Sequence, residues 1–238
     1  MNLVLTLLIF LSYATNILAV SYSLPDCYGR PIDQRLVEKM NITNGIFIEV
    51  GANDGITQSN TKLLEEQYGW TGILIEPSDV LFERLKKNRP TARYFQCALG
   101  TFEQNNTFLY GDFDGHLMAS INGDRLNSPN GLKQVLTRSL QSILDELGIT
   151  HINFFSLDTE GYEQNILKGI DFKKTTFDYL LIEIYRAQYQ EIVQFLASHG
   201  YTLLENFSNY SHALNPVWDG THNDYLFARN ELAIKEMS

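Results

Sequence analysis

Acidic side chains at the ends of apolar runs are the residues of this sequence best suited to chemistry. Glu49 lies near the end of the run IFIEV and Glu76 ends the run GILIE, and a glycine-rich turn, GANDG at 51–55, directly follows the first run. Glycines let the chain turn sharply there and let a ligand approach the backbone. A carboxylate at the end of the second strand can accept both hydroxyls of a ribose. We therefore expect a nucleoside site at this point.

The turn does not have the pattern of a dinucleotide site. It reads G-x-N-x-G instead of G-x-G-x-x-G, and Asn53 and Asp54 stand where a phosphate would meet a carboxylate. The 25 residues from Gly51 to Glu76, in place of about 20, also disfavour a nicotinamide dehydrogenase. An acidic rim of Glu49, Asp54 and Glu76 instead attracts a cationic nucleoside without phosphates, such as S-adenosylmethionine. The alternative is that Glu49 and Glu76 are solvated charges at strand ends.

A second set of carboxylates follows two later apolar runs. Asp158 and Glu160 come directly after the run INFFSL, and Glu183 lies near the end of YLLIEI. Such carboxylates can take a proton from an alcohol, or hold Mg²⁺ through hard oxygen ligands. Asp158 and Glu160 can also simply stabilise a helix that begins near Tyr162, by about 0.3 to 1 kcal/mol. The residues alone leave these three readings open.

Three histidines, His116, His212 and His222, fall in segments that we expect above the carboxyl edge of the sheet. Each fits a solvated loop residue as well as a catalytic one, and His222 is favoured because it adjoins a strand. We take Asp158, Glu160 and His222 as the candidate catalytic residues. We assign no metal ligand.

The elements that must position these residues alternate between strand and helix along the chain, which is the α/β pattern. Several runs are apolar almost throughout, as expected of parallel strands covered on both faces. The strands are expected at 46–50, 73–75, 94–97, 152–157, 179–184, 201–206 and 225–228. The helices are expected at 34–40, 60–68, 80–88, 140–147, 163–168 and 188–198. Between 100 and 133 the pattern breaks into polar turns, where substrate-selecting loops are common.

Composition narrows the class of protein. The 238 residues are 44% apolar, which is enough for a proper core, and 28 acidic against 18 basic residues give a net charge of −10. Such a surface repels phosphate backbones, so we expect no nucleic-acid partner. Two cysteines, Cys27 and Cys97, exclude a disulfide scaffold and a zinc module.

The amino-terminal segment differs from the rest. Leu3 to Val20 is mostly apolar, the first positive charge is Arg30, and Ala19-Val20-Ser21 offers small residues to a signal peptidase. We expect a signal peptide or signal anchor at 1–21, membrane anchoring through it in the second case, and one domain at 25–238. This places the protein in the secretory pathway, as a lumenal, secreted or membrane-anchored protein.

Two long blocks carry a resemblance to a known family. FIEVGANDGITQSNTKLLEEQYGWTGILIEPSDVLFERLKKNRP resembles the first half of the FkbM-type methyltransferases, and FFSLDTEGYEQNILKG, Phe154 to Gly169, resembles the D-x-E-G-x-E block of that family. The blocks stand in the family's order, about a hundred residues apart. The resemblance implies a class I methyltransferase, Rossmann-like α/β fold: a seven-stranded, mostly parallel sheet with one antiparallel strand and helices on both faces.

The resemblance also implies the cofactor, S-adenosyl-L-methionine, and a set of residues that bind it. Glu49, Gly51, Asn53 and Gly55 would line its methionine end, Glu76 would take the ribose, and Ala98 would lie near the adenine; we add Asp54 and Asp158 to this set. Family members are typically O-methyltransferases, so we expect a small-molecule or glycan acceptor. The alternative is a non-catalytic, membrane or lumenal FkbM-like protein that acts in trafficking or binding. The intact acidic and glycine positions favour the enzyme.

Overall fold

The computed structural model describes residues 20–127, 131–216 and 218–237. The predicted leader lies outside the described residues except for its last two, so the leader and its boundary with the domain stay predictions. No helix among the described ranges combines the length and the apolar character that a membrane crossing requires.

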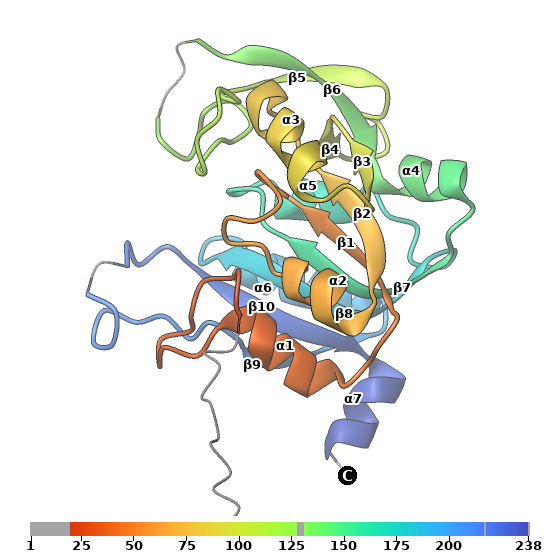
Figure 1. The fold of residues 1–238 in the computed structure, drawn as a ribbon, viewed down its shortest axis with the longest axis vertical. Helices are drawn as coiled ribbons and strands as arrows, with labels where there is room; N and C mark the ends of the chain where they lie inside the picture. The colour runs from red at the N-terminus through yellow and green to blue at the C-terminus, as the bar shows by residue number, and fades with distance from the viewer. Residues whose placement is uncertain (1–19, 128–130, 217, 238) are drawn as a thin grey trace, which may run out of the picture.

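A seven-stranded sheet forms the centre of the molecule (Figure 1), in the order β3-β2-β1-β7-β8-β10-β9. Its strands are β1 (Ile46–Val50), β2 (Thr71–Ile75), β3 (Arg93–Phe95), β7 (His151–Leu157), β8 (Thr176–Tyr185), β9 (Tyr201–Asn206) and β10 (His222–Arg229). Pairing from β3 to β8 is parallel, and β10 runs antiparallel to β8 and β9. The predicted fold class is therefore confirmed, including its single antiparallel strand.

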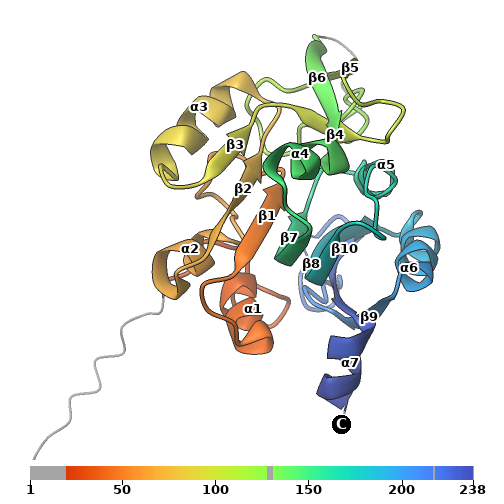
Figure 2. The ribbon, with the colours of Figure 1, turned by 90° about the vertical axis from the view of Figure 1, so that its right-hand side faces the viewer.

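Helices cover both faces of this sheet (Figure 2). One face carries α1 (Ile32–Met40), α2 (Lys62–Tyr68) and α3 (Asp79–Asn88), and the other carries α4 (Leu140–Leu147), α5 (Glu163–Leu167) and α6 (Tyr189–Ser198). A last helix, α7 (Asn230–Met237), follows β10 and was not predicted. The apolar runs of the central strands are buried because helices pack on both sides of them.

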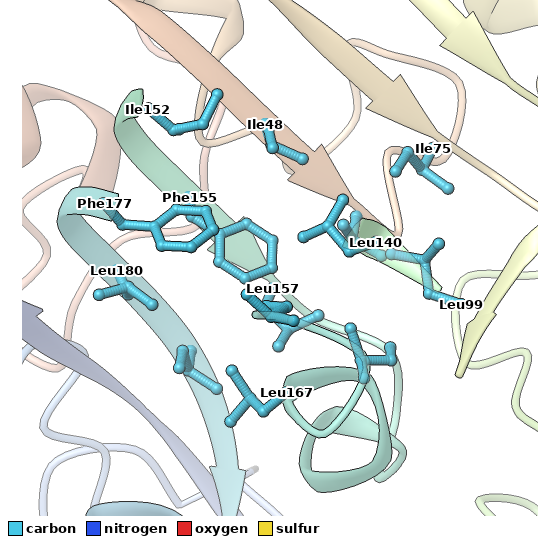
Figure 3. Close-up of a cluster of buried hydrophobic side chains, with 14 of the residues drawn as sticks. Ile48, Ile75, Leu99, Leu140, Ile152, Phe155, Leu157, Leu167, Phe177 and Leu180 are labelled. Atoms are coloured by element: carbon cyan, nitrogen blue, oxygen red, sulfur yellow. The ribbon is translucent and has the colours of Figure 1, made fainter. Parts of the chain in front are cut away.

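Two apolar layers hold the helices to the sheet. Ile48, Phe155 and Leu180 face α4 to α6 and pack with Leu140 and Leu167 (Figure 3), whereas alternate residues of the same strands face α1 to α3. Side chains of successive strand residues point to opposite faces, so each central strand contributes to both layers. The strand ends that bear the candidate site are thereby fixed on a rigid support.

The segment 100–133 is mostly turns in its described part, as predicted, but it also contributes to a second sheet that was not predicted. Its strands are β4 (Ala98–Gly100), β5 (Thr107–Gly111) and β6 (Lys133–Ser139), in the order β4-β6-β5. The predicted strand 94–97 is shorter and starts earlier, as β3 ends at Phe95, and β4, which follows it, pairs with β6 in the second sheet. The strands β5 and β6 are short and half exposed, so their apolar signal is weak.

Candidate functional site

A pocket opens where β1, β2 and β7 end, at the edge to which parallel strands bring their carboxyl ends. Glu76, the backbone of the turn after β1 and the segment that begins with Asp158 form its polar wall. Leu81, Ala98 and Phe113 contribute apolar wall. The pocket thus brings together most of the residues predicted from the sequence.

Glu76 is buried at the end of β2 and is held by the backbone on both sides. Its Oε2 accepts a hydrogen bond from the amide of Asn53 at 2.9 Å, and its Oε1 accepts one from the amide of Ser78 at 2.9 Å. Burial raises the pKa of Glu76 to about 7, against the opposing effect of these two bonds. The carboxyl is therefore fixed in the pocket wall and close to its titration point at neutral pH.

The turn after β1 depends on glycine. The amides of Gly51 and Ala52 both donate to the carbonyl of Ile75 at 3.1 Å, which fastens the turn to β2. Gly51 has φ +79°, and Asn53 also adopts the left-handed region at φ 50°. Asparagine tolerates that region better than most residues. The pattern of Gly and Asn in this turn therefore follows from its backbone.

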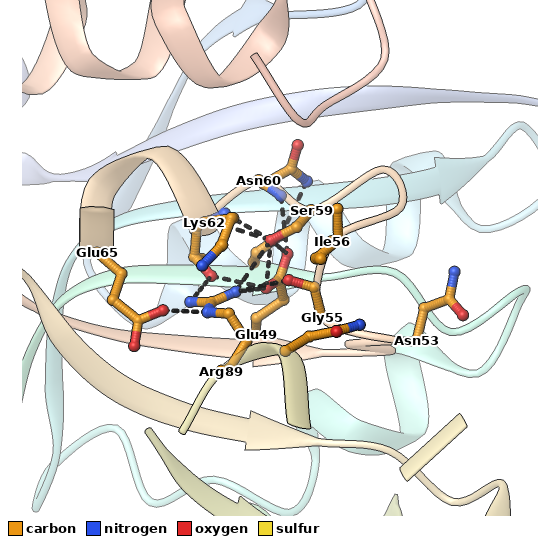
Figure 4. Close-up of polar contacts among 12 residues, drawn as sticks. Glu49, Asn53, Gly55, Ile56, Ser59, Asn60, Lys62, Glu65 and Arg89 are labelled. Carbon is orange, nitrogen blue, oxygen red and sulfur yellow. Dashed lines mark hydrogen bonds and ion pairs between the residues drawn. The ribbon is translucent and has the colours of Figure 1, made fainter. Parts of the chain in front are cut away.

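Glu49 lines the pocket, but its carboxylate oxygens accept hydrogen bonds from the protein itself (Figure 4). Ser59 Oγ donates to it at 2.9 Å, the amide of Asn60 at 2.8 Å and Thr61 Oγ1 at 2.6 Å. The guanidinium of Arg89 lies 3.7 Å away. Glu49 thus holds the start of α2 from the pocket lining, and its predicted place at the methionine end of the cofactor stays a prediction.

Arg89 is the residue of this cluster that sequence reasoning did not single out. It is fully buried, forms an ion pair with Glu65 and donates to the carbonyl of Gly55 at 3.2 Å (Figure 4). A buried guanidinium persists only where its charge and its donors are satisfied. Arg89 thus ties α3 to the turn and to α2.

Asp54 and Gly55, both predicted to bind cofactor, do not line the pocket. Asp54 turns back on its own loop, where its carboxylate accepts hydrogen bonds from the amides of Ile56 at 2.9 Å and Thr57 at 2.7 Å. Gly55 lies over Arg89, whose Cγ would be 2.8 Å from an added Cβ. Both residues shape the turn, and spacing alone did not reveal which members of GANDG face inward.

Asp158 reaches the pocket from the end of β7. It is open to solvent on the pocket side and surrounded by protein on its other sides. This burial, reinforced by the nearby carboxyl groups of Glu160, Asp224 and Glu163, raises the pKa of Asp158 well above its usual value. A carboxylate in such a setting is a stronger proton acceptor than one in water.

Glu160 is not a free base, contrary to the prediction. Its Oε2 accepts a hydrogen bond from Arg125 Nε at 2.9 Å and one from Tyr185 Oη at 2.6 Å. Its backbone has φ 57°, a costly conformation that this ion pair and hydrogen bond help to hold. Glu160 lies in the pocket wall as an anchor for Arg125.

The capping alternative for Asp158 and Glu160 is also wrong. The amides ahead of α5 are bonded by Glu163, whose Oε1 accepts from the amide of Thr159 at 2.8 Å and from that of Gly161 at 3.2 Å. As for the magnesium alternative, no group of three or more His, Cys, Asp or Glu within the described ranges is arranged to hold a metal ion.

His222 does not reach the pocket. It begins β10, and its Nε2 lies 3.3 Å from Glu183 Oε1, behind the pocket wall. The histidine that does line the pocket is His116, which contacts Asp114 at 3.2 Å. Adjacency to a strand did not indicate a position in the pocket lining, because the register of β10 carries His222 onto the sheet.

A loop that sequence reasoning left uninterpreted covers one side of the pocket. Phe113, Leu117 and Ile121 of this loop face the pocket, and Arg125 anchors it. Besides Glu160, Arg125 holds Asp219 through Nη2 at 2.5 Å, and its guanidinium lies over the ring of Tyr185. The segments after β5, β7 and β9 are thereby joined through one side chain.

The chemistry of the pocket fits S-adenosyl-L-methionine. Each oxygen of Glu76 accepts one amide and retains a lone pair for a ribose hydroxyl. Leu81, Ala98 and Phe113 offer apolar surface to an adenine, and no lysine or arginine lines the pocket in the part of the chain that the structure describes. A cationic nucleoside thus meets carboxyl groups and apolar walls without a competing positive charge.

Comparisons with known proteins identify a family for this chain. A family model for the methyltransferase FkbM domain matches residues 49–203. Among solved structures, a TehB-like SAM-dependent methyltransferase from Corynebacterium glutamicum has TM-score 0.43 at 13% identity, over 85% of this chain and 90% of that one. A precorrin-6y C5,15-methyltransferase from Geobacter metallireducens has TM-score 0.45 at 9% identity, over 83% and 88%. Aeropyrum pernix fibrillarin, with natively bound S-adenosyl-L-methionine, has TM-score 0.46 at 13% identity, over 78% and 67%. No curated protein matches the sequence.

Proposed function

The chain belongs to the FkbM methyltransferase family and uses S-adenosyl-L-methionine, and on this premise we propose that it methylates a hydroxyl group of a glycan or of another hydroxylated small molecule. We further propose that Glu76 holds the cofactor ribose and that Asp158 takes the proton of the acceptor hydroxyl. Methyl transfer thereby has a named acceptor group, a hydroxyl, and two named residues.

One observation carries the proposal: within the described ranges, Asp158 is a pocket carboxyl with no ion pair and no hydrogen bond from a backbone amide, whereas both oxygens of Glu76 accept such bonds. Glu160, beside Asp158 in the pocket wall, forms an ion pair with Arg125. Glu49 accepts hydrogen bonds from residues at the start of α2. An alcohol is a poor nucleophile while it holds its proton, and a base in reach accelerates its reaction by roughly 10² to 10⁴. Asp158 supplies such a base at the site where the acceptor must lie.

The bound cofactor supplies a methyl group activated by a sulfonium. The chain contributes mainly position, because methyl transfer is a displacement that needs the acceptor oxygen about 3 Å from the methyl carbon. Glu76 and the turn after β1 fix one end of the cofactor, while Phe113 and Leu117 cover the pocket and limit access of water. The same apolar side chains offer a surface for the ring of an acceptor.

Calorimetric titration with S-adenosyl-L-methionine tests the binding part. Replacement of Glu76 by Ala removes a charged hydrogen-bond acceptor and should weaken binding by about 1.5 to 3 kcal/mol, which is roughly 10- to 100-fold. Glu103→Ala, at an exposed position outside the pocket, is the matched control and should bind as the unchanged protein does. Equal affinity of Glu76→Ala and the control would contradict the assignment of Glu76.

Transfer of a labelled methyl group to a panel of sugars, glycosides and other alcohols tests the chemical part. Asp158→Asn should retain the cofactor affinity and lose transfer by roughly 10²-fold or more. Methylation confined to amines or carboxylic acids would contradict a hydroxyl acceptor. A parallel loss of affinity and transfer in Asp158→Asn would assign Asp158 to cofactor binding instead.

A further inference from the structure

Behind Asp158, three adjacent strands place three carboxyl groups in one row. Leu157 of β7 pairs with Ile182 of β8, which sets Asp158 beside Glu183, and Glu183 pairs directly with Asp224 of β10. Side chains at paired positions lie on the same face of a sheet. Asp158 is the member of the row that faces the pocket, and Glu183 is only 6% exposed.

A hydrogen bond between Asp158 and Glu183 requires a proton. The register of β7 and β8 places the two carboxyl groups side by side on one face of the sheet. Glu183 Oε2 is buried and receives no hydrogen bond from an N–H or O–H group of the described chain. Two ionised carboxylates have no hydrogen to donate, so the contact becomes a hydrogen bond only when one of them is protonated. The pair is therefore built to hold one proton between its two members.

Most of the titratable groups around the pair are acidic. The titratable groups that face Glu183 come from the segment after β7, from β8, from β10 and from the loop before it: Asp158, Glu160, Glu163, Tyr185, Tyr210, His222 and Asp224. Burial, followed by repulsion from Asp158 and its neighbouring carboxylates, raises the pKa of Glu183 well above its usual value. Arg125 balances Glu160 on the pocket side.

His222 connects this pair to solvent. Its Nε2 lies 3.3 Å from Glu183 Oε1, and its Nδ1 side faces Thr221 Oγ1 at 3.0 Å and Asp219 at 3.7 Å. The His222 side chain is 19% exposed and that of Asp219 is 37% exposed. The contacts from Asp158 through Glu183 to His222 thus run from the pocket wall to the surface.

We propose that Glu183 and His222 carry away the proton that Asp158 takes from the acceptor hydroxyl. The inference rests on the proposed function of Asp158 as the base. The O–H bond of the acceptor breaks, its proton goes to Asp158, and the oxygen forms the C–O bond as the C–S bond of the sulfonium breaks. The proton already shared by the pair passes from Glu183 to His222 Nε2 and leaves as the imidazolium is deprotonated by water. Glu183 is a positioning residue, and His222 is the exit.

Infrared spectroscopy of the acceptor-free protein tests whether the pair shares a proton. A band of protonated carboxyl should be present at pH 7 and should be lost in both Asp158→Asn and Glu183→Gln. Glu76 contributes its own protonated carboxyl near this pH, and that contribution should persist in both variants. Glu103→Gln is the matched control and should leave the spectrum unchanged. No loss of band intensity in either variant overturns the proposal.

A pH jump followed by infrared detection tests the exit. After a jump from pH 6 to pH 9, the pair should lose its proton in a fast phase, and His222→Gln should abolish that phase because glutamine keeps a hydrogen bond but carries no proton. His199→Gln, at an exposed histidine that caps α6, is the control. An unchanged fast phase in His222→Gln removes His222 from the path. Both measurements need neither cofactor nor acceptor, so a failure of cofactor binding in calorimetry would count against the proposed function alone.

Discussion

The carbonyl oxygen of Asp158 lies where a side chain on Gly51 would begin. An ideal Cβ on Gly51 would stand 1.9 Å from that oxygen, and the residue has φ +79°. The backbone that leaves β1 therefore touches the backbone that leaves β7, and this contact sets the distance between the two polar walls of the pocket. Glycine is required here for space as well as for conformation.

Replacement of Gly51 by Ala should separate these two requirements. The added methyl group must push the Asp158 backbone away, so we expect a loss of cofactor affinity. We also expect the free energy of unfolding to fall by more than the left-handed conformation alone costs an alanine, which is about 1 to 2 kcal/mol. Gly148→Ala is the matched control, since Gly148 has φ +66° with open space around it. Urea unfolding and calorimetry of both variants measure the difference, and equal costs would show that the wall can move freely.

Glu76 should make cofactor binding depend on pH. The pKa of Glu76 is about 7 in the free protein, and ribose hydroxyls prefer to donate to its ionised form. Below pH 7 the carboxyl is mostly protonated, so Glu76 must release its proton when the cofactor binds, and binding becomes weaker. We expect the dissociation constant to rise by up to roughly tenfold per pH unit below pH 7 and to stay level above pH 8. Calorimetry in buffers of different ionisation enthalpy measures both effects. If a Glu76→Gln variant kept the same dependence of the dissociation constant on pH, that dependence would belong to another group.

The sequence allowed the sheet, its two layers of helices and the position of the pocket to be predicted, because these depend on apolar periodicity and on the ends of parallel strands. Glu76 was predicted for the same reason, because a carboxylate at the end of a parallel strand lies at the edge of the sheet where the pocket forms. The small sheet of β4, β5 and β6 was not predicted, since its strands are half exposed and have little apolar signal.

Side-chain partners were the part that sequence could not give. Asp54 and Glu160 have the right type and position, yet the first turns back on its loop and the second pairs with Arg125, which lies 35 residues away in the chain. Such pairings depend on how a loop folds back over the sheet. For the same reason Arg89 and Arg125 carried no recognisable signal, although each joins three segments.

Arg125 should act as the fastener of the loop over the pocket. Arg125→Lys keeps the charge but cannot hold Glu160 and Asp219 with one planar group. Loss of the largely buried hydrogen bond to Glu160 costs about 1.5 to 3 kcal/mol, while the more exposed contact with Asp219 adds little. Hydrogen exchange over residues 112–125 should therefore be roughly 10- to 100-fold faster. The control is Arg93→Lys on the exposed edge strand β3, which should leave exchange in this loop unchanged.

If loop exchange in Arg125→Lys stays as slow as in the unchanged protein, apolar contacts of Phe113 and Ile121 hold the loop without Arg125. Both side chains are buried, so their packing alone could hold the loop in place. A double variant that also replaces Phe113 by Ala would then be needed to free the loop.

The buried carboxyl groups should make the protein more stable in mild acid than in mild alkali. Burial raises the pKa of Glu76, Glu183 and Asp224, and a carboxyl whose pKa is higher in the folded chain stabilises the fold while it is protonated. That contribution is complete below the unfolded pKa and is lost as pH rises through the folded one. For Glu76, with a folded pKa of about 7, it amounts to about 3 kcal/mol.

The opposite sign applies at low pH. For Asp26, burial would raise the pKa, but hydrogen bonds from the backbone of Arg30 and Tyr28 outweigh it and lower the pKa, and Asp219 is lowered to about 2. These groups stabilise the fold while ionised and lose that effect as pH falls through their folded pKa. We therefore expect the midpoint of thermal unfolding to rise as pH falls from 8 to about 5 and to drop below about 4. Glu183→Gln should flatten this rise because it removes one buried carboxyl that titrates, whereas Glu103→Gln should leave the rise unchanged. If the midpoint of the unchanged protein instead increases from pH 6 to pH 8, the row of carboxyl groups is hydrated and ionised throughout.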